Sequence, residues 1–238
     1  MANSTLTKQR STAFRSTVAL KSAMAVTGVI LVLFLIAHMY GNLMVFGGQE
    51  VFDNYAHHLR ELGEPMLPHE GALWIIRVVL LASVLIHAYA AFTLWARARR
   101  ARAATGVRRY QSTQNKKGVQ RSYASFTMRW GGVIVILFVV YHLLHFTTNH
   151  IAPGGASDSP YQRVVNGFEI WWVVLSYLIA MLAVGLHLRH GIWSATQTLG
   201  QNKAGRQRGL NVIATAIAAV ITVGFLVPPF SIFFGLVG

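Results

Sequence analysis

The amino-acid sequence predicts an all-α integral membrane protein, a single domain of residues 1–238 whose five membrane-spanning helices form a bundle. Hydrophobic residues make up 54% of the chain and charged residues only 12%, about half of the roughly 25% found in soluble domains. Five apolar stretches are also long enough to cross about 30 Å of hydrocarbon, which takes about 20 helical residues. The longest polar interval, residues 97–129, is too short to fold as a separate soluble domain.

The expected helices follow one another with short interruptions. We expect them at about 22–46, 71–96, 130–151, 168–189 and 210–236. Turn-forming glycine and proline residues lie between them: Gly47-Gly48, Gly63 to Pro68, Pro153-Gly154-Gly155 and Gly200 to Gly209. The first stretch is long and has no small-residue cleavage site beside it, so we expect a retained helix and not a signal peptide.

The charged residues predict how the helices are oriented. Lysine and arginine gather before the first helix, between the second and third, and between the fourth and fifth, whereas the other two intervals are poor in bases. The bases of these three segments are Lys8, Arg10, Arg15 and Lys21; Arg97, Arg99, Arg100, Arg102, Arg108, Arg109, Lys116, Lys117, Arg121 and Arg129; and Arg189, Lys203, Arg206 and Arg208. The positive-inside rule then places the N-terminus in the cytoplasm and Gly238 outside. Because topology and anionic lipid account for the net charge of +14, we expect no nucleic-acid partner.

The chain contains no cysteine. It therefore cannot by itself hold a thiolate-ligated iron–sulfur cluster, a disulfide or a c-type haem.

One histidine inside each of the first four apolar stretches is a candidate metal ligand: His38, His87, His142 and His187. An ionisable side chain at bilayer depth is expensive and needs a partner, which makes a functional role the default hypothesis. His38 and His142 lie far along helices that run outward, whereas His87 and His187 lie toward the inner ends of helices that run inward. Depth therefore pairs His38 with His142 and His87 with His187.

Two bis-imidazole sites at different depths would suit two haem b groups between the helices. The simplest alternative is that the histidines hydrogen-bond across the bundle. Zinc is a weaker candidate, since it usually takes three or four ligands at one depth and no buried acid or cysteine is available. His145 and His190 each lie three residues beyond a candidate ligand, and depth alone does not choose between His142 and His145.

Two glycines and three cations could contact the same inner haem. Gly28 and Gly132 each precede an outer candidate ligand by ten residues, about 15 Å along a helix, which is near the level of the inner pair. A glycine there would let a macrocycle approach the backbone, although small-residue helix packing explains it equally well. Depth selects Lys21, Arg129 and Arg189 as partners for the haem propionates, with ordinary membrane anchoring as the alternative.

Four segments, taken in order, resemble the ligand helices of the succinate dehydrogenase cytochrome b subunit family. They are LIAHMYGN at 35–42, LIHAYAA at 85–91, RWGGVIVILFVVYHLLHFT at 129–147 and LHLRHGIWS at 186–194. More narrowly, they resemble the single-chain, five-helix, di-haem type of Gram-positive bacteria and some fumarate reductases. GQEVFDNYAHHLRELG at 48–63 also resembles the outer loop of that group, and the similarity covers roughly residues 20–200.

The resemblance implies that His38 and His142 ligate the outer haem iron and that His87 and His187 ligate the inner one. It selects His142 over His145, because His142 follows an aromatic residue as the family ligand does. It also implies a bacterial plasma membrane location, with a flavoprotein and an iron–sulfur subunit on the cytoplasmic face and electron flow from succinate to menaquinone. Some members carry an acid two positions before the last ligand. This chain has Gly185 there, so we do not expect a proton path through that position.

The quinone could bind at either end of the bundle. Candidates at the outer end are Tyr40, Asn42, His145 and Glu61, with Glu50 and Asp53 nearby, and candidates at the inner end are Trp193, Ser194 and Ser22. We favour the outer end, because a second haem is needed only if electrons travel past the first. The alternatives are a di-haem subunit of a hydrogenase or formate dehydrogenase, and a non-redox transporter or anchor. The inward-facing basic interval favours a cytoplasmic partner and thus the first interpretation.

Overall fold

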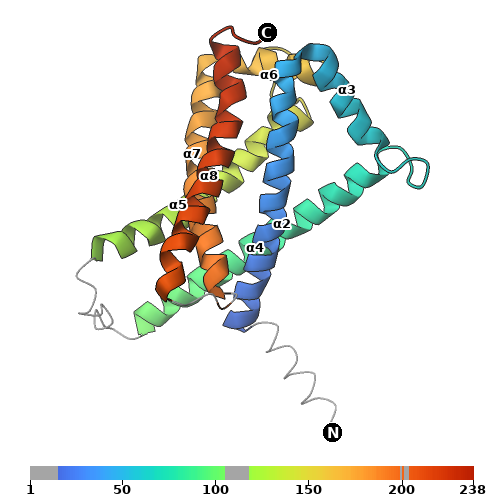
Figure 1. Cartoon of the computed structure of the whole chain (residues 1–238). Helices are drawn as coiled ribbons and strands as arrows, with labels where there is room; N and C mark the ends of the chain where they lie inside the picture. Colours follow the sequence, from blue (N-terminus) through green and yellow to red (C-terminus); the bar gives the residue numbers. More distant parts are fainter. Residues whose placement is uncertain (1–15, 105–117, 199, 201–203) are drawn as a thin grey trace.

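The fold is that of a computed structural model, which describes residues 16–104, 118–198, 200 and 204–238. These residues form helices and connecting turns and contain no strand (Figure 1). Within this described part of the chain, five helices are long and apolar enough to cross a membrane. The expectation of an all-α, multi-pass membrane protein with five spans is therefore confirmed. Some of the basic residues named above lie outside the described part of the chain: Lys8, Arg10, Arg15, Arg108, Arg109, Lys116, Lys117 and Lys203.

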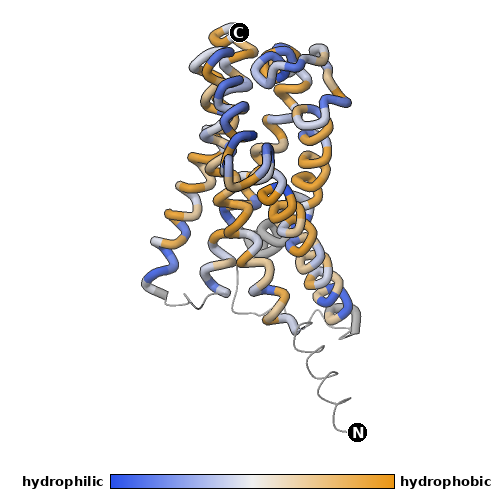
Figure 2. Tube along the Cα trace, turned by 90° about the vertical axis from the view of Figure 1, so that its right-hand side faces the viewer, coloured by the Kyte–Doolittle hydropathy of each residue, from blue (hydrophilic) through white to orange (hydrophobic). Residues whose placement is uncertain are grey.

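The five long helices are α2 (Thr17–Leu43), α4 (Gly71–Ala104), α5 (Gly118–His142), α7 (Trp171–Thr198) and α8 (Ala204–Phe233). Ser16 caps the first of them, because its side-chain oxygen accepts a hydrogen bond from the backbone N–H of Ala19. Figure 2 shows hydrophobic residues along much of these helices. Large side chains such as Leu33, Leu137 and Val220 are more than half exposed, as expected of residues that face lipid tails.

Several helix ends differ from the sequence expectation. Helix α4 continues to Ala104, beyond the expected end at 96, and α5 begins at Gly118, before the expected start at 130. The fourth helix begins at Trp171 and continues to Thr198, well beyond the expected end at Arg189. Hydropathy marks where a helix leaves the hydrocarbon, but a polar helix can continue past that level. The third span also ends earlier than expected, since α5 passes into a π-helical turn, η3 (Leu143–Thr147), and Asn149 then adopts a positive φ of 56°.

Short helices cover one end of the bundle, where the sequence predicts only loops. They are η1 (Met44–Gly47), α3 (Gly48–Glu61) and α6 (Pro160–Phe168). Asp53 of α3 joins the last two, because its carboxylate accepts hydrogen bonds from Ser159 Oγ at 2.6 Å and from the backbone N–H of Tyr161 at 2.9 Å. We call this the cap end; the C-terminus also lies there (Figure 1).

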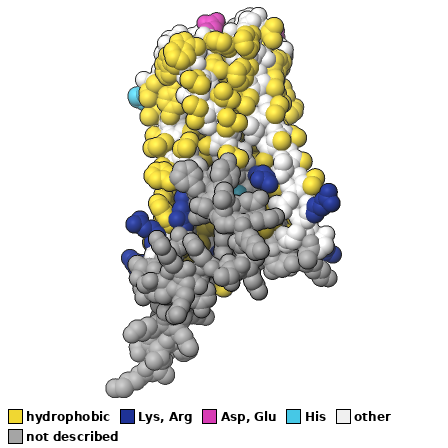
Figure 3. Space-filling model, turned by 90° about the vertical axis from the view of Figure 1, so that its left-hand side faces the viewer, with side chains coloured by type: hydrophobic (Ala, Val, Ile, Leu, Met, Phe, Trp, Pro, Cys, Tyr) yellow, Lys and Arg dark blue, Asp and Glu magenta, His cyan; other side chains and the backbone are white. Residues whose placement is uncertain are grey.

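Charge is divided between the two ends of the molecule. All seven acidic residues fall within 50–70 and 158–169, in and beside the cap helices, whereas most of the bases that the structure describes lie toward the opposite end, which we call the basic end. Figure 3 shows this division, with Lys and Arg low on the molecule and an acidic side chain at the top. The sidedness of the membrane relative to these ends stays a prediction.

Packing within the bundle brings particular helices together. Helix α2 contacts α4, α7 and α8, and α5 contacts α7. The largest buried cluster lies at the cap end and includes Val45, Phe168, Val173 and Tyr177. A second cluster around Met181 and Val184 continues it toward the middle of the bundle. The four helices that carry the candidate histidines are thus packed as two pairs, α2 with α4 and α5 with α7, joined through α2 and α7.

Candidate functional site

The four candidate histidines meet in two pairs. The ring centroids of His38 and His142 lie 5.7 Å apart with the ring planes at 83°. Those of His87 and His187 lie 6.2 Å apart with the planes at 60°. These are the pairs that helix direction predicts. Each pair joins two helices from different parts of the chain, α2 with α5 and α4 with α7.

The spacing within each pair fits one metal ion between two imidazoles. With metal–nitrogen bonds of about 2 Å and about 1.2 Å from each nitrogen to its ring centre, opposed axial imidazoles have centres roughly 6.3 Å apart. The two observed separations, 5.7 and 6.2 Å, are close to this value. Among the described residues no group of three or more His, Cys, Asp or Glu could hold an ion alone. A two-ligand pair suits an iron whose other ligands come from a macrocycle.

The structure separates the two histidine candidates on α5 and its π-helical continuation. His142 faces His38, whereas His145 is only 2% exposed and stacks on Phe146 with ring centroids 3.9 Å apart. On α7, the ring of His190 contacts Trp193, while His187 faces His87. The histidines that face the other two candidates are therefore His142 and His187.

Two hydroxyl groups contact the candidate ligands from neighbouring helices. Thr27 Oγ1 on α2 lies 3.2 Å from Nδ1 of His87 on α4. The Tyr177 hydroxyl on α7 lies 3.2 Å from Nδ1 of His142 and also 3.2 Å from Nδ1 of His145. Neither Thr27 nor Tyr177 can be identified from the sequence, because a side-chain contact between helices depends on their rotation, and hydropathy does not report rotation.

Gly28 and Gly132 occupy equivalent places beside the inner pair. A Cβ atom at Gly28 would lie 3.6 Å from Cε1 of His87, and one at Gly132 would lie 3.6 Å from Cε1 of His187. Each glycine thus lies at the level of the inner histidines, as the ten-residue spacing predicts. Both distances are ordinary van der Waals contacts, so the histidine rings alone do not require glycine there. The expected approach of a macrocycle stays a prediction.

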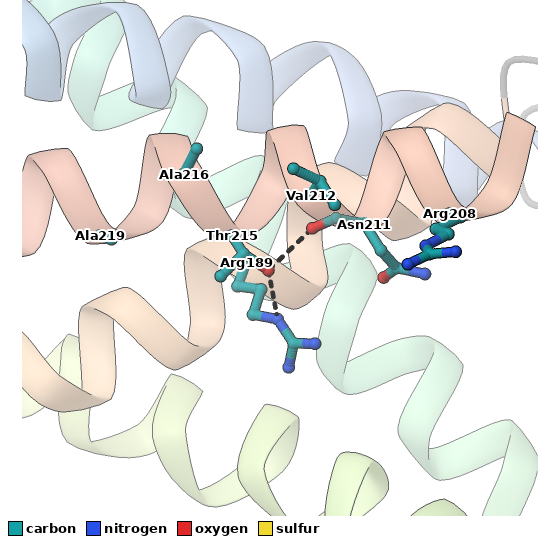
Figure 4. A pocket seen from close by; sticks show the side chains of 7 residues that line it. All are labelled: Arg189, Arg208, Asn211, Val212, Thr215, Ala216 and Ala219. Atoms are coloured by element: carbon teal, nitrogen blue, oxygen red, sulfur yellow. Dashed lines mark hydrogen bonds between the residues drawn. The ribbon is translucent and has the colours of Figure 1, made fainter.

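The three candidate cations lie toward the basic end but differ in their surroundings. Lys21 is exposed. The guanidinium of Arg129 lies over the Trp95 ring, 5.7 Å from its centroid. Arg189 reaches α8, where its Nε donates to Thr215 Oγ1 at 2.9 Å. It lines an open cleft of about 710 Å³ together with Arg208, Asn211 and several small apolar residues (Figure 4).

The quinone candidates are not brought together as one cluster. Tyr40 is 58% exposed and its ring contacts Tyr55. Glu61 lies at the end of α3 and pairs with His57 at 3.4 Å. Among the described residues no hydrogen bond or ring contact joins His145 to Tyr40, Asn42 or Glu61. At the inner end, the Trp193 indole N–H donates to Gln207 at 3.1 Å.

Comparison with known proteins identifies the family. Residues 108–223, about half of the chain, match the model of the succinate dehydrogenase/fumarate reductase transmembrane subunit. The match covers 116 of the 238 residues and supports placing the chain in this family. No match was found among the curated proteins or among the solved structures. The matched segment contains α5, α7 and most of α8, and thus two of the four candidate ligands, His142 and His187.

Membership of the family defines the general role of the chain. It is a membrane-anchor subunit of a succinate dehydrogenase or fumarate reductase complex, which is an oxidoreductase, and it associates with the other subunits of that complex. Members of the family generally bind haem b and quinone. The paired histidines supply imidazole side chains, which are of the kind that ligates haem iron.

Proposed function

We propose that this chain is the di-haem cytochrome b anchor of a bacterial succinate:menaquinone oxidoreductase. In this proposal it holds two haem b groups and binds a flavoprotein and an iron–sulfur subunit on the cytoplasmic face of the plasma membrane. Succinate is oxidised in the flavoprotein, and this chain carries the electrons from the iron–sulfur subunit to menaquinone. Haem b, when bound, supplies a one-electron carrier at each of the two levels.

The observation that carries the proposal is the presence of two facing histidine pairs at different heights. His38 and His142 would hold the outer iron, and His87 and His187 the inner one. Gly28 lies beside the inner pair and precedes His38 by ten residues, so the pairs are about 15 Å apart along the helix axes. One haem would need only one pair. The second pair extends the electron path toward the other membrane surface.

Charge supports a cytoplasmic partner at the basic end. The bases there have no acidic residue of this chain near them, because all seven acids lie in and beside the cap helices. Lys21, Arg129 and Arg189 are the proposed partners of the inner haem propionates, since cationic donors stabilise a carboxylate most strongly. Gly28 and Gly132 are proposed to let the inner macrocycle approach the helix backbone.

We place the menaquinone at the cap end, beside the outer pair. A quinone needs an apolar slot with a few polar groups for its carbonyl oxygens, and Tyr40 and Asn42 are the nearest exposed or partly exposed candidates along α2. Glu61 would have to act from the far end of α3. Because His145 is buried and contacts Tyr177, which also contacts His142, we propose that it acts on His142 through Tyr177 and does not contact the quinone directly.

The proposal is tested on the intact complex purified with its partner subunits. Haem extraction should give two haem b per copy of this chain, and succinate should reduce a menaquinone analogue. A ratio of one haem b per chain, measured from chemically reduced-minus-oxidised difference spectra, would refute the di-haem assignment. Reduction by hydrogen or formate, with no response to succinate, would identify the chain as the anchor of a different respiratory enzyme.

A further inference from the structure

Hydroxyl groups contact one histidine of each pair, and the number of available protons determines the direction of their hydrogen bonds. Thr27 Oγ1 lies 2.7 Å from the backbone carbonyl of Ala23 and 3.3 Å from that of Met24. A hydroxyl has one proton, and carbonyl oxygens can only accept. The Thr27 hydroxyl therefore donates its proton to a backbone carbonyl of α2. Its oxygen accepts a hydrogen bond from Nδ1–H of His87. This fixes the tautomer of His87 and leaves Nε2 with a free lone pair.

Tyr177 lies between two histidines and so divides them into a donor and an acceptor. Its hydroxyl is 3.2 Å from Nδ1 of both His142 and His145. With only one proton, it can donate to one ring and must accept from the other. If His142 coordinates iron through Nε2, its Nδ1 carries the proton and donates to Tyr177. Tyr177 then donates to Nδ1 of His145, which completes a chain His142–Tyr177–His145.

The other histidine of each pair lacks such a contact. Nδ1 of His187 is buried with no hydrogen-bonding partner, and no hydrogen bond joins the ring of His38 to a described residue. The residues beside the two equivalent glycines explain why only one histidine of the inner pair has a hydroxyl contact. Thr27 directly precedes Gly28 on α2, whereas on α5 the residue directly before Gly132 is Gly131, which has no hydroxyl.

We propose that Thr27 and Tyr177 are positioning residues that each hold one axial histidine as an Nδ1–H donor, Thr27 at the inner haem and Tyr177, supported by His145, at the outer haem. This inference rests on the proposed function, because it assigns these contacts to a haem ligand. An acceptor on Nδ1–H fixes the orientation of the ring and makes it a stronger electron donor to the metal. A stronger donor favours ferric iron and lowers the reduction potential. The bond from Tyr177 to His145 polarises the tyrosine and strengthens it as an acceptor.

The test is an optical redox titration of the purified complex carrying Thr27→Val or Tyr177→Phe. Each variant should raise the potential of one haem only: Thr27→Val the inner, Tyr177→Phe the outer. We expect the reduction equilibrium to change roughly tenfold, which is about 59 mV for a one-electron couple. His145→Phe should raise the outer potential by less, because it removes only the far partner of Tyr177. If Tyr177→Phe binds no outer haem, the His145→Phe variant decides the outer assignment.

Matched controls separate tuning from general disturbance. Thr27→Ser retains a hydroxyl at this position and should keep the native reduction potential of the inner haem. Thr222→Val removes the same kind of hydroxyl, bonded at 2.7 Å to the carbonyl of Ala218, at a place where no histidine contact occurs. Tyr161→Phe is the corresponding control for a buried tyrosine. Neither control should move either potential.

The outcomes distinguish this inference from the proposed function. Full haem content with unmoved potentials in Thr27→Val and Tyr177→Phe would overturn the inference alone. Equal shifts of both haems in either variant would also overturn it, since each contact reaches a single pair. Retention of both haems in His38→Ala and His87→Ala would overturn the ligand assignment itself.

Discussion

His142 and His145 are three residues apart, and the structure gives them different surroundings. His142 faces the ring of His38, and His145 is buried against Phe146 and Tyr177. Sequence spacing places both on neighbouring faces of a helix, so it identifies the pair of candidates but not the member that faces another helix. The depth of a residue can be predicted from helix direction, and depth was enough to match His38 with His142. The rotation of the helix about its own axis determines which of the two histidines faces His38.

Alanine substitution at the residue scale should remove one haem at a time. His38→Ala and His142→Ala should lose the outer haem, and His87→Ala and His187→Ala the inner one, because each iron loses an axial bond. His190→Ala should keep both haems, and so should His145→Phe with its altered outer potential. Haem per chain is measured by pyridine haemochrome and by the reduced spectrum. Loss of haem in the His145 variant with retention in His142→Ala would reverse the assignment on α5.

At the scale of elements, the five spans follow from hydropathy, but the cap helices do not. A membrane-spanning helix needs about 20 consecutive apolar residues, and such stretches are plain in the sequence. Helices α3 and α6 are short and polar on one side, and their hydrophobic faces pack through Phe52, Val165 and Phe168. The π-helical turn after His142 is also not visible in the sequence, because its backbone pattern depends on packing against α6 and α7. Such turns occur often at functional sites.

Asp53 should be the main polar link between the two cap helices. Its carboxylate accepts from Ser159 Oγ and from the backbone N–H of Tyr161. Asp53→Ala leaves both donors without this partner, which should cost about 1–3 kcal/mol of local stability. The expected result is a lower thermal midpoint of the purified complex with unchanged haem content. Asp158→Ala is the control, because it removes an acid from the same end of the molecule; an equal loss of stability there would contradict the role of Asp53.

At the scale of the whole molecule, the division of charge is the strongest structural asymmetry. Acids lie in and beside the cap helices, and the basic end has no acidic residue of this chain. In the proposed complex, negative charge for that end comes from anionic lipid, from the haem propionates and from the partner subunits. The open cleft beside Arg189 and Arg208 lies on this side of the molecule. Sequence alone predicts this asymmetry, because it needs only the order of the spans and the positions of the charges.

The positive-inside rule predicts that the cap end faces outward, and the absence of cysteine makes this directly testable. A single cysteine can be placed in the chain without removing any native thiol. His57→Cys lies on α3 at the cap end and Arg100→Cys on α4 at the basic end, and both positions are exposed. A membrane-impermeant maleimide should label His57→Cys in intact cells, because that side chain faces the outside. Arg100→Cys should be labelled only in inverted vesicles stripped of the peripheral subunits. The reverse pattern would place the basic end outside, and with it the inner haem and the partner subunits, which is incompatible with electron entry from the cytoplasmic face.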